Sequence, residues 1–234
     1  MRRLAIVTAT NRELRAAVDG APGISSPEPV PWRWRGIDIY LVNCGMGPVN
    51  AALSLGRLLE YGSELGGIIN LGIAGSFDRE ALPLYQTVVV REEIWPEFGL
   101  RTADGVDPAG LKYGHGTLGG KTVRDRLQLD PESALARMGI PTSLPWRQGR
   151  SLTVAGASGD PEQAEWFRRR YSPDLENMEG FALAWACLKY GIPFLEVRCV
   201  SNAVGARDRK DWDIRGAMAG LGPVMDALRD RMEF

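Results

Sequence analysis

Histidine and cysteine, which are common zinc ligands, are scarce in this chain. The 234 residues include one histidine and three cysteines, and these cysteines (Cys44, Cys187 and Cys199) are far apart and lie in apolar segments. A single histidine and scattered thiols do not supply the clustered ligands of a typical zinc site. We therefore expect the cysteines to be buried and reduced, and we expect no metal or other cofactor.

An excess of charge of one sign is also lacking, because 28 basic residues are balanced by 29 acidic ones. The densest basic run, residues 166–171, is typical of the solvated face of a helix, whereas a nucleic-acid surface gathers more positive charge in one place. No apolar run is long enough to span a membrane, and residues 4–7 near the start are too few for a signal peptide. These absences argue against nucleic-acid and membrane partners and predict a cytoplasmic protein.

Apolar residues are plentiful, at 44% of the chain, which is enough to bury a full core. Runs of apolar residues that do not alternate predict buried strands, and segments of helical periodicity lie between them. This order predicts an α/β fold: a single domain, residues 1–234, with a central mixed, mostly parallel twisted sheet flanked by helices. The strands are expected at residues 4–7, 37–42, 67–72, 87–90, 151–155 and 194–200.

Helices are expected between these strands. Thr10 or Asn11 can cap the first helix, which places Glu13 in its first turn. Gly191 is typical of the residue that ends a helix. Residues 93–150 have little periodicity, so we expect long loops there, with a short helix near 131–138. The remaining helices are expected at residues 49–60, 161–169 and 180–190, and within 214–232.

Two glycine-rich segments look like phosphate-binding motifs, but neither has the correct spacing. In residues 114–122, His115 occupies the position where a P-loop has its first glycine, and no buried strand precedes the segment. In Gly45-Met46-Gly47, Asn50 occupies the third glycine position of a dinucleotide fingerprint. We expect a surface loop in the first case and no nicotinamide cofactor in the second.

Polar residues at the ends of predicted strands give the stronger signal, because open α/β sheets bind ligands there. Glu13 follows the first strand, small residues 72–76 follow the third, and Met178-Glu179 and Ser201-Asn202 follow two others. Each has an ordinary alternative: an acid in a first turn favours the helix dipole, and a strand-ending Asn often caps a turn. The prediction of a ligand site depends on their occurring together.

The order and local sequence of these sites resemble the purine-nucleoside phosphorylase and nucleosidase superfamily. The resemblance covers nearly the whole chain and is greatest to the methylthioadenosine/S-adenosylhomocysteine nucleosidase branch. It is carried by residues 8–14, 44–53, 70–75, 157–160 and 177–187.

Within that branch, residues 201–208 together with Trp212 are similar to the futalosine hydrolases. The resemblance implies N-glycosidic hydrolysis of futalosine, releasing hypoxanthine and dehypoxanthine futalosine in an alternative menaquinone pathway. A methylthioadenosine/S-adenosylhomocysteine-type nucleosidase, an inosine-type purine nucleoside phosphorylase and a nucleoside-binding protein without activity stay open as alternatives. A homodimer or higher homo-oligomer is also implied.

The resemblance implies a role for each of these residues. Glu13 would activate water, Glu179 would hold the ribose hydroxyls and Asn202 would read the purine. An Asn amide offers two donors and one acceptor, so Asn202 suits a 6-oxopurine, whereas a 6-aminopurine favours Asp. The substrate-binding residues implied by the resemblance are Ala74, Gly75, Phe77, Met178 and Trp212, with Phe77 as the candidate for stacking on the base.

The choice between water and phosphate as nucleophile follows from two positions. Hexameric phosphorylases of this superfamily have an arginine for phosphate just before the glycine segment, and here that position is Asn70. Glu13 would also repel phosphate, so we expect a hydrolase. The carboxyphenyl tail of futalosine needs an apolar slot and a cation, for which Arg101, Lys112 and Arg207 are candidates.

Overall fold

The computed structural model describes residues 3–26, 28–141, 143–206, 208 and 211–231, and its centre is one sheet. Within these residues, nine strands pair in the order β10-β5-β11-β12-β4-β1-β3-β2, and β13 pairs with both β4 and β5. The pairs β1–β3, β1–β4 and β4–β13 are parallel, whereas β5–β13 and β4–β12 are antiparallel. The strands are β1 Arg3–Thr8, β2 Val30–Trp34, β3 Ile37–Asn43, β4 Leu65–Ser76, β5 Thr87–Ile94, β10 Arg126–Gln128, β11 Arg147–Thr153, β12 Leu175–Asn177 and β13 Phe194–Ala203.

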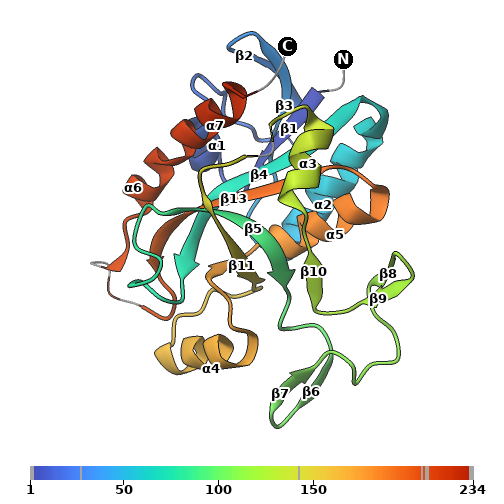
Figure 1. The fold of residues 1–234 in the computed structure, drawn as a ribbon, viewed down its shortest axis with the longest axis vertical. Helices are drawn as coiled ribbons and strands as arrows, with labels where there is room; N and C mark the ends of the chain where they lie inside the picture. The colour runs from blue at the N-terminus through green and yellow to red at the C-terminus, as the bar shows by residue number, and fades with distance from the viewer. Residues whose placement is uncertain (1–2, 27, 142, 207, 209–210, 232–234) are drawn as a thin grey trace.

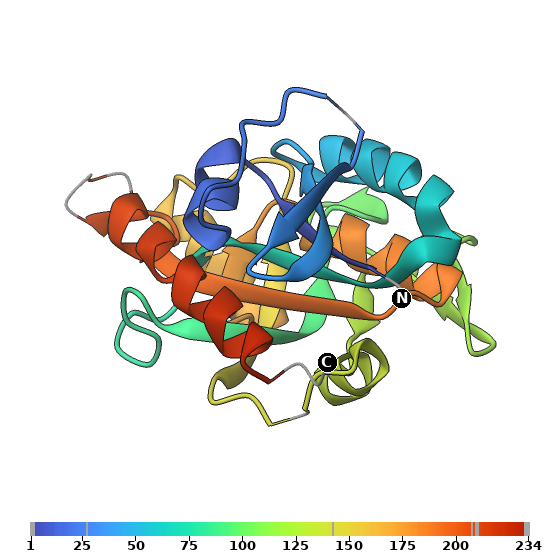
Figure 2. The same ribbon diagram turned by 90° about the horizontal axis from the view of Figure 1, so that it is seen from above.

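Helices cover both faces of the sheet (Figures 1 and 2). Helices α1, α3, α6 and α7 share one apolar core with the sheet, and α2 and α5 share another. In β1, Leu4 and Ile6 belong to the first core and Ala5 and Val7 to the second, so burial on both faces explains its continuous apolar run. The helices are α1 Asn11–Ala17, α2 Pro48–Leu58, the 3-10 helix η1 Leu59–Glu64, α3 Pro131–Met138, α4 Pro161–Tyr171, α5 Gly180–Tyr190, α6 Ile214–Ala219 and α7 Leu221–Arg229.

The helix ends agree with the local sequence. The Thr10 side chain caps α1 by accepting a hydrogen bond from Glu13 N at 3.2 Å, and Asp130 and Asp160 cap α3 and α4 in the same manner. Gly191 ends α5 with φ 68°, a left-handed conformation that favours glycine. The predicted α/β class and the mixed, mostly parallel sheet are confirmed.

Some predicted boundaries are wrong. The strand expected at residues 67–72 does not end at Gly72, because β4 continues to Ser76 and pairs with β13 from Ile68 onward. Strand β13 likewise extends past Val200, so Asn202 lies within it. The last helix is two helices, since α6 ends at Ala219 and α7 begins at Leu221.

Residues 93–150 are more ordered than their sequence indicated. They contain β10, α3 and two small hairpins that lie at the edge of the molecule in Figure 1: β6 (Leu100–Thr102) with β7 (Gly105–Asp107), and β8 (Gly116–Leu118) with β9 (Lys121–Val123). The glycine-rich segment 114–122 forms much of the second hairpin. Strands of three residues are too short to produce a periodic signal.

All three cysteines are free thiols with buried side chains, as predicted. Burial raises the pKa of Cys44 to about 12 and that of Cys199 to about 11. In the described part of the chain, no helix has both the length and the apolar character needed to cross a membrane.

Candidate active site

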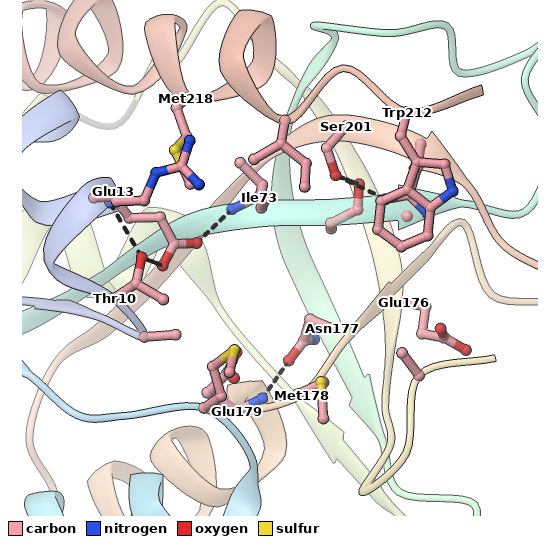
Figure 3. A pocket seen from close by; sticks show the side chains of 18 residues that line it. Thr10, Glu13, Ile73, Glu176, Asn177, Met178, Glu179, Ser201, Trp212 and Met218 are labelled. Atoms are coloured by element: carbon pink, nitrogen blue, oxygen red, sulfur yellow. Dashed lines mark hydrogen bonds between the residues drawn. The ribbon is translucent and has the colours of Figure 1, made fainter. Parts of the chain in front are cut away.

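The candidate site is a cavity of about 300 Å³ where β1, β4, β12 and β13 end (Figure 3). Residues that were far apart in the sequence converge on it, as expected for the ends of neighbouring strands. Its lining includes nearly all of the predicted site residues. The lining residues are Ala9, Thr10, Arg12, Glu13, Met46, Ile73, Ala74, Gly75, Ala157, Glu176, Asn177, Met178, Glu179, Ser201, Asn202, Trp212, Ile214 and Met218.

Glu13 lies on one side of this cavity, in the first turn of α1, and its side chain is buried. Its Oε1 accepts a hydrogen bond from the Ile73 backbone at 3.1 Å, and its Oε2 accepts one from Thr10 Oγ1 at 2.8 Å (Figure 3). Burial raises the pKa of Glu13 above its ordinary value, although these two hydrogen bonds oppose the change. A fixed carboxylate with a raised pKa is suited to take a proton from water.

Glu179 lies across the cavity from Glu13, just before α5, and is also buried. Its Oε1 accepts a hydrogen bond from the Gly47 backbone at 3.0 Å. Asn177 fixes the backbone around it, because Asn177 Oδ1 accepts from the amides of Glu179 at 2.8 Å and Gly180 at 2.7 Å. The carboxylate is thereby held at the cavity wall, where it can accept hydrogen bonds from hydroxyl groups.

Arg198, which the sequence analysis missed, lies behind these two carboxylates. It is 1% exposed, and its Nε donates to Glu196 Oε1 at 2.8 Å while its Nη1 lies 3.7 Å from Glu179 Oε2. Burial alone would lower its pKa, but Glu196 and Glu179 keep the pKa of Arg198 above its ordinary value. The sequence did contain an indication of Arg198, because the charged residues 196 and 198 share one face of an otherwise apolar strand.

Asn202 lies in β13 beside Gly75 of β4. Its Oδ1 accepts from Ser201 Oγ at 2.8 Å and its Nδ2 donates to Ala203 O at 3.0 Å. A Cβ atom on Gly75 would lie 3.1 Å from Asn202 Nδ2 and 2.8 Å from Val204 Cγ2, so glycine leaves room for this amide. The second hydrogen of Nδ2 and a lone pair of Oδ1 can still bind a ligand.

The cavity brings together most of the predicted substrate-binding residues. Ala74, Gly75 and Met178 line it, and Trp212 reaches it through a backbone bridge to Asn202. Trp212 is 39% exposed as a residue, and its Nε1 donates to Ala206 O at 2.9 Å, which fixes the indole.

Phe77 is the exception. It lies outside this lining and packs against the core that includes Phe167 and Tyr171 of α4. The reason is the length of β4, because this strand carries the chain past the cavity before Phe77 is reached.

The cavity also contains residues that the sequence analysis did not select. Arg12 precedes Glu13 in α1, is exposed and lines the cavity, whose lining also includes the apolar residues Met46, Ile214 and Met218. The position of Arg12 next to Glu13 in the sequence could have indicated that Arg12 belongs to the site. Glu176 lines the far wall, and its carboxylate is bound by the amide and hydroxyl of Ser158.

Two of the three cations predicted for the tail of the substrate lie elsewhere. Arg101 belongs to the exposed hairpin strand β6 and Lys112 to the following loop, and neither lines the cavity. Arg207 lies outside the described residues. Among the described residues, no cluster of three histidine, cysteine or acidic side chains could bind a metal ion.

With this geometry in view, comparison with known proteins identifies the family. A family model described as the phosphorylase superfamily matches residues 3–226, and the chain belongs to this superfamily. It is 33% identical to a futalosine hydrolase of Thermus thermophilus over 83% of this chain and 84% of that one. It is 31% identical to a futalosine hydrolase of Streptomyces coelicolor over 98% of this chain and 95% of that one.

A solved structure has the same fold. The 5′-methylthioadenosine/S-adenosylhomocysteine nucleosidase of Helicobacter pylori superimposes with a TM-score of 0.75 over 99% of both chains. The two sequences are 14% identical, so this likeness concerns the fold alone.

Proposed function

We propose that the chain is an N-glycosyl hydrolase that cleaves futalosine into hypoxanthine and dehypoxanthine futalosine, in the cytoplasm and in an alternative menaquinone pathway. The observation that carries this proposal is the convergence of Glu13, Glu179 and Asn202 on one cavity. The identity to two futalosine hydrolases, over most of their length, supports the choice of substrate.

Glu13 is the general base. It takes a proton from a water molecule while the water oxygen bonds to the anomeric carbon and the bond from that carbon to the purine breaks. The electron pair of the broken bond goes to the purine, and positive charge develops on the ribose. Burial favours this step, because the raised pKa of Glu13 makes it a stronger base than an exposed glutamate.

Glu179 holds the ribose by accepting hydrogen bonds from its hydroxyl groups. Its negative charge lies close to the developing ribosyl cation and stabilises it more than the neutral substrate. Arg198 Nη1, 3.7 Å from Glu179 Oε2, holds this carboxylate in position, and Met178 provides an apolar contact beside the sugar.

Asn202 reads the purine. The free hydrogen of Nδ2 donates to the 6-oxo group, and Oδ1 accepts from N7 once water has protonated the departing purine there, which fits hypoxanthine. An amide cannot protonate the leaving group, but a 6-oxopurine spreads the negative charge onto its carbonyl oxygen. The purine lies against the backbone of Ala74 and Gly75. Trp212 is the one aromatic residue in the described lining, and its ring can cover the purine.

Water is preferred to phosphate as the nucleophile. Two buried carboxylates, Glu13 and Glu179, face the place where an anionic nucleophile would have to approach. Asn70, at the position of the phosphate-binding arginine, is buried and does not line the cavity. A second anion is repelled at short range in such a site of low dielectric constant.

Arg12 binds the carboxylate of the substrate tail. No ion pair to its guanidinium occurs among the described residues, in contrast to Arg57 or Arg126, which both pair with glutamates. Met46, Ile214 and Met218, which line the same cavity, provide the apolar slot for a phenyl ring. An exposed cation beside apolar side chains fits an aromatic acid.

A second copy of the chain covers the opening. Met46, Val49 and Leu53 are 64%, 80% and 72% exposed, and the last two lie four residues apart on α2. Large apolar side chains grouped on one helix face are typical of a protein interface. Since Met46 also lines the cavity, a homodimer or higher homo-oligomer through this face completes the site.

The test is base release, followed by chromatography, from futalosine, inosine, methylthioadenosine and aminodeoxyfutalosine, each with and without phosphate. We expect hypoxanthine from futalosine, independent of phosphate. Adenine release would favour the methylthioadenosine-type nucleosidase, and phosphate-dependent release would favour a phosphorylase. Thermal stabilisation by hypoxanthine without turnover of any nucleoside would indicate a binding protein.

A further inference from the structure

Beneath the cavity, two glutamates that the proposed mechanism does not use lie together in the core. Glu93 of β5 and Glu196 of β13 have no exposed surface, and β5 and β13 are paired strands. Both side chains reach Gly180, where a Cβ atom would collide with Glu93 Oε1 and lie 2.6 Å from Glu196 Oε1. Gly180 is therefore required for these two carboxyl groups to meet behind Glu179.

The partners of the two carboxyl groups differ. Glu93 is bound by neutral groups, with Thr153 Oγ1 at 2.5 Å from its Oε2 and Asn177 Nδ2 at 2.8 Å from its Oε1. Glu196 is bound by the Arg198 guanidinium at 2.8 Å. The other oxygen of Glu196, Oε2, is buried without a hydrogen-bond donor among the described residues. A proton between the carboxyl groups would supply that missing donor.

The charges around this pair also require a proton. Arg198 is the cation that acts on this pair of carboxyl groups, and it already pairs with Glu179 as well as with Glu196. A further ionised carboxylate at Glu93 would be buried next to Glu196 without a cation of its own, which is strongly unfavourable.

We propose that Glu93 is protonated and shares its proton with Glu196, and that this pair positions Arg198 against Glu179. The inference rests on the proposed function, because it assigns positioning residues to the ribose-holding carboxylate of that site. Burial raises the pKa of Glu93 well above its ordinary value, and the charge of Glu196 raises it further. Burial also raises the pKa of Glu196, while Arg198 opposes that change.

The consequence is a pH-dependent affinity. When the shared proton is lost at alkaline pH, the added negative charge draws Arg198 toward the pair and away from Glu179. The groups that face Glu93 are Glu196 and Arg198 from β13, Thr153 from β11 and Asn177 from β12. Of these, Glu196 and Arg198 carry charge. Substitution of Glu93 leaves both of them in place, so it tests the effect of the Glu93 proton alone.

The kinetic test compares Glu93→Gln with Glu196→Gln. The amide of Glu93→Gln mimics the protonated acid, so KM at neutral pH should stay within about twofold of the parent, and the alkaline rise in KM should disappear. Glu196→Gln leaves Arg198 without its nearest partner, so KM should rise about tenfold, with a smaller change in kcat. Equal losses in both variants at neutral pH would mean that Glu93 is ionised, and would overturn the proposal.

A matched control and a measurement independent of activity complete the test. Glu92→Gln removes a neighbouring buried carboxylate of β5 that pairs with Arg126 and Gln128 and leaves Arg198 untouched, so KM should not change. The infrared carbonyl stretch of a protonated carboxyl group should be present at neutral pH in the parent protein and lost in Glu93→Gln. Absence of that band in the parent would refute the shared proton even if base release confirms the hydrolase, and its presence without hydrolysis would refute the proposed function alone.

Discussion

Glu13 and Arg198 face each other across Gly72 of β4. A Cβ atom on Gly72 would lie 3.0 Å from Glu13 Oε1 and 2.5 Å from Arg198 Nη1, so only a hydrogen atom fits between them. The two groups also interact electrostatically, since the charge of Arg198 lowers the pKa of Glu13 against the larger effect of burial. Arg198 thus links the proposed base to Glu179, 3.7 Å away on its other side.

Gly72→Ala should reduce catalysis more than stability. The added methyl group displaces either Arg198 or Glu13, and a shift of about 1 Å in such a site can cost about 100-fold in rate. We expect a fall of that size in kcat/KM for futalosine, measured by hypoxanthine release. Gly62→Ala, in η1, is the control because nothing lies within 4 Å of its added methyl group, and it should keep full activity. Equal activity of the two variants would exclude this role of Gly72.

The activity should fall at acidic pH because Glu13 must be ionised to accept a proton. Its pKa is raised by burial, so the decline begins above the range of an ordinary glutamate as the pH is lowered. Glu13→Gln should lower kcat at least about 100-fold while hypoxanthine still binds. The exposed Glu162 of α4 provides the control variant, Glu162→Gln, which should keep both the rate and the decline of activity at acidic pH. If Glu13→Gln shows the same decline as the parent protein, another group causes it.

Asn202→Asp should change the choice of base. A carboxylate accepts hydrogen bonds and cannot donate to the 6-oxo group of hypoxanthine, but it accepts from the amino group of adenine. We expect the ratio of kcat/KM for futalosine to that for aminodeoxyfutalosine to fall by about tenfold or more. Asn202→Ala should weaken both substrates without reversing the preference. If Asn202→Asp leaves the ratio unchanged, Asn202 does not read this position of the purine.

Arg12→Gln should affect only substrates that carry an anionic tail. Loss of a charge-assisted hydrogen bond at this exposed site should raise KM for futalosine about tenfold and leave turnover of inosine, where measurable, unchanged. Arg101→Gln, in the exposed strand β6 outside the cavity, should have no effect on either substrate. The reverse result, with Arg101 controlling KM, would restore the sequence-based candidate.

Leu53→Lys should dissociate the proposed dimer. Leu53 is 72% exposed on α2, and a charge there is unfavourable in an apolar interface. Sedimentation should show a smaller species, and KM for futalosine should rise because the opening near Met46 is no longer covered. Tyr190→Lys, at a similarly exposed apolar residue at the end of α5, is the control. A dissociated variant with an unchanged KM would show that each chain binds the tail alone.

Much of the fold could be predicted because it depends on local patterns. The non-alternating apolar run of β1, the Thr10 cap of α1 and the Gly191 end of α5 each act within a few residues. The short hairpin strands β6 to β9 could not be predicted, since their pairing depends on neighbours rather than on their own sequence. The length of β4 was missed for the same reason, because its partner β13 keeps Gly72–Gly75 extended.

Local sequence patterns were enough to predict that Glu13, Glu179 and Asn202, near the ends of buried strands, would line one cavity. The surroundings of these three residues depend on contacts between distant parts of the chain. The tertiary structure placed Phe77 against the core beside α4, brought Arg12 to the cavity and put Arg198 between the carboxylates. Strand order and the burial of charge are set by contacts between distant segments, and these contacts decide which side chain is paired, which is protonated and which is left for a ligand.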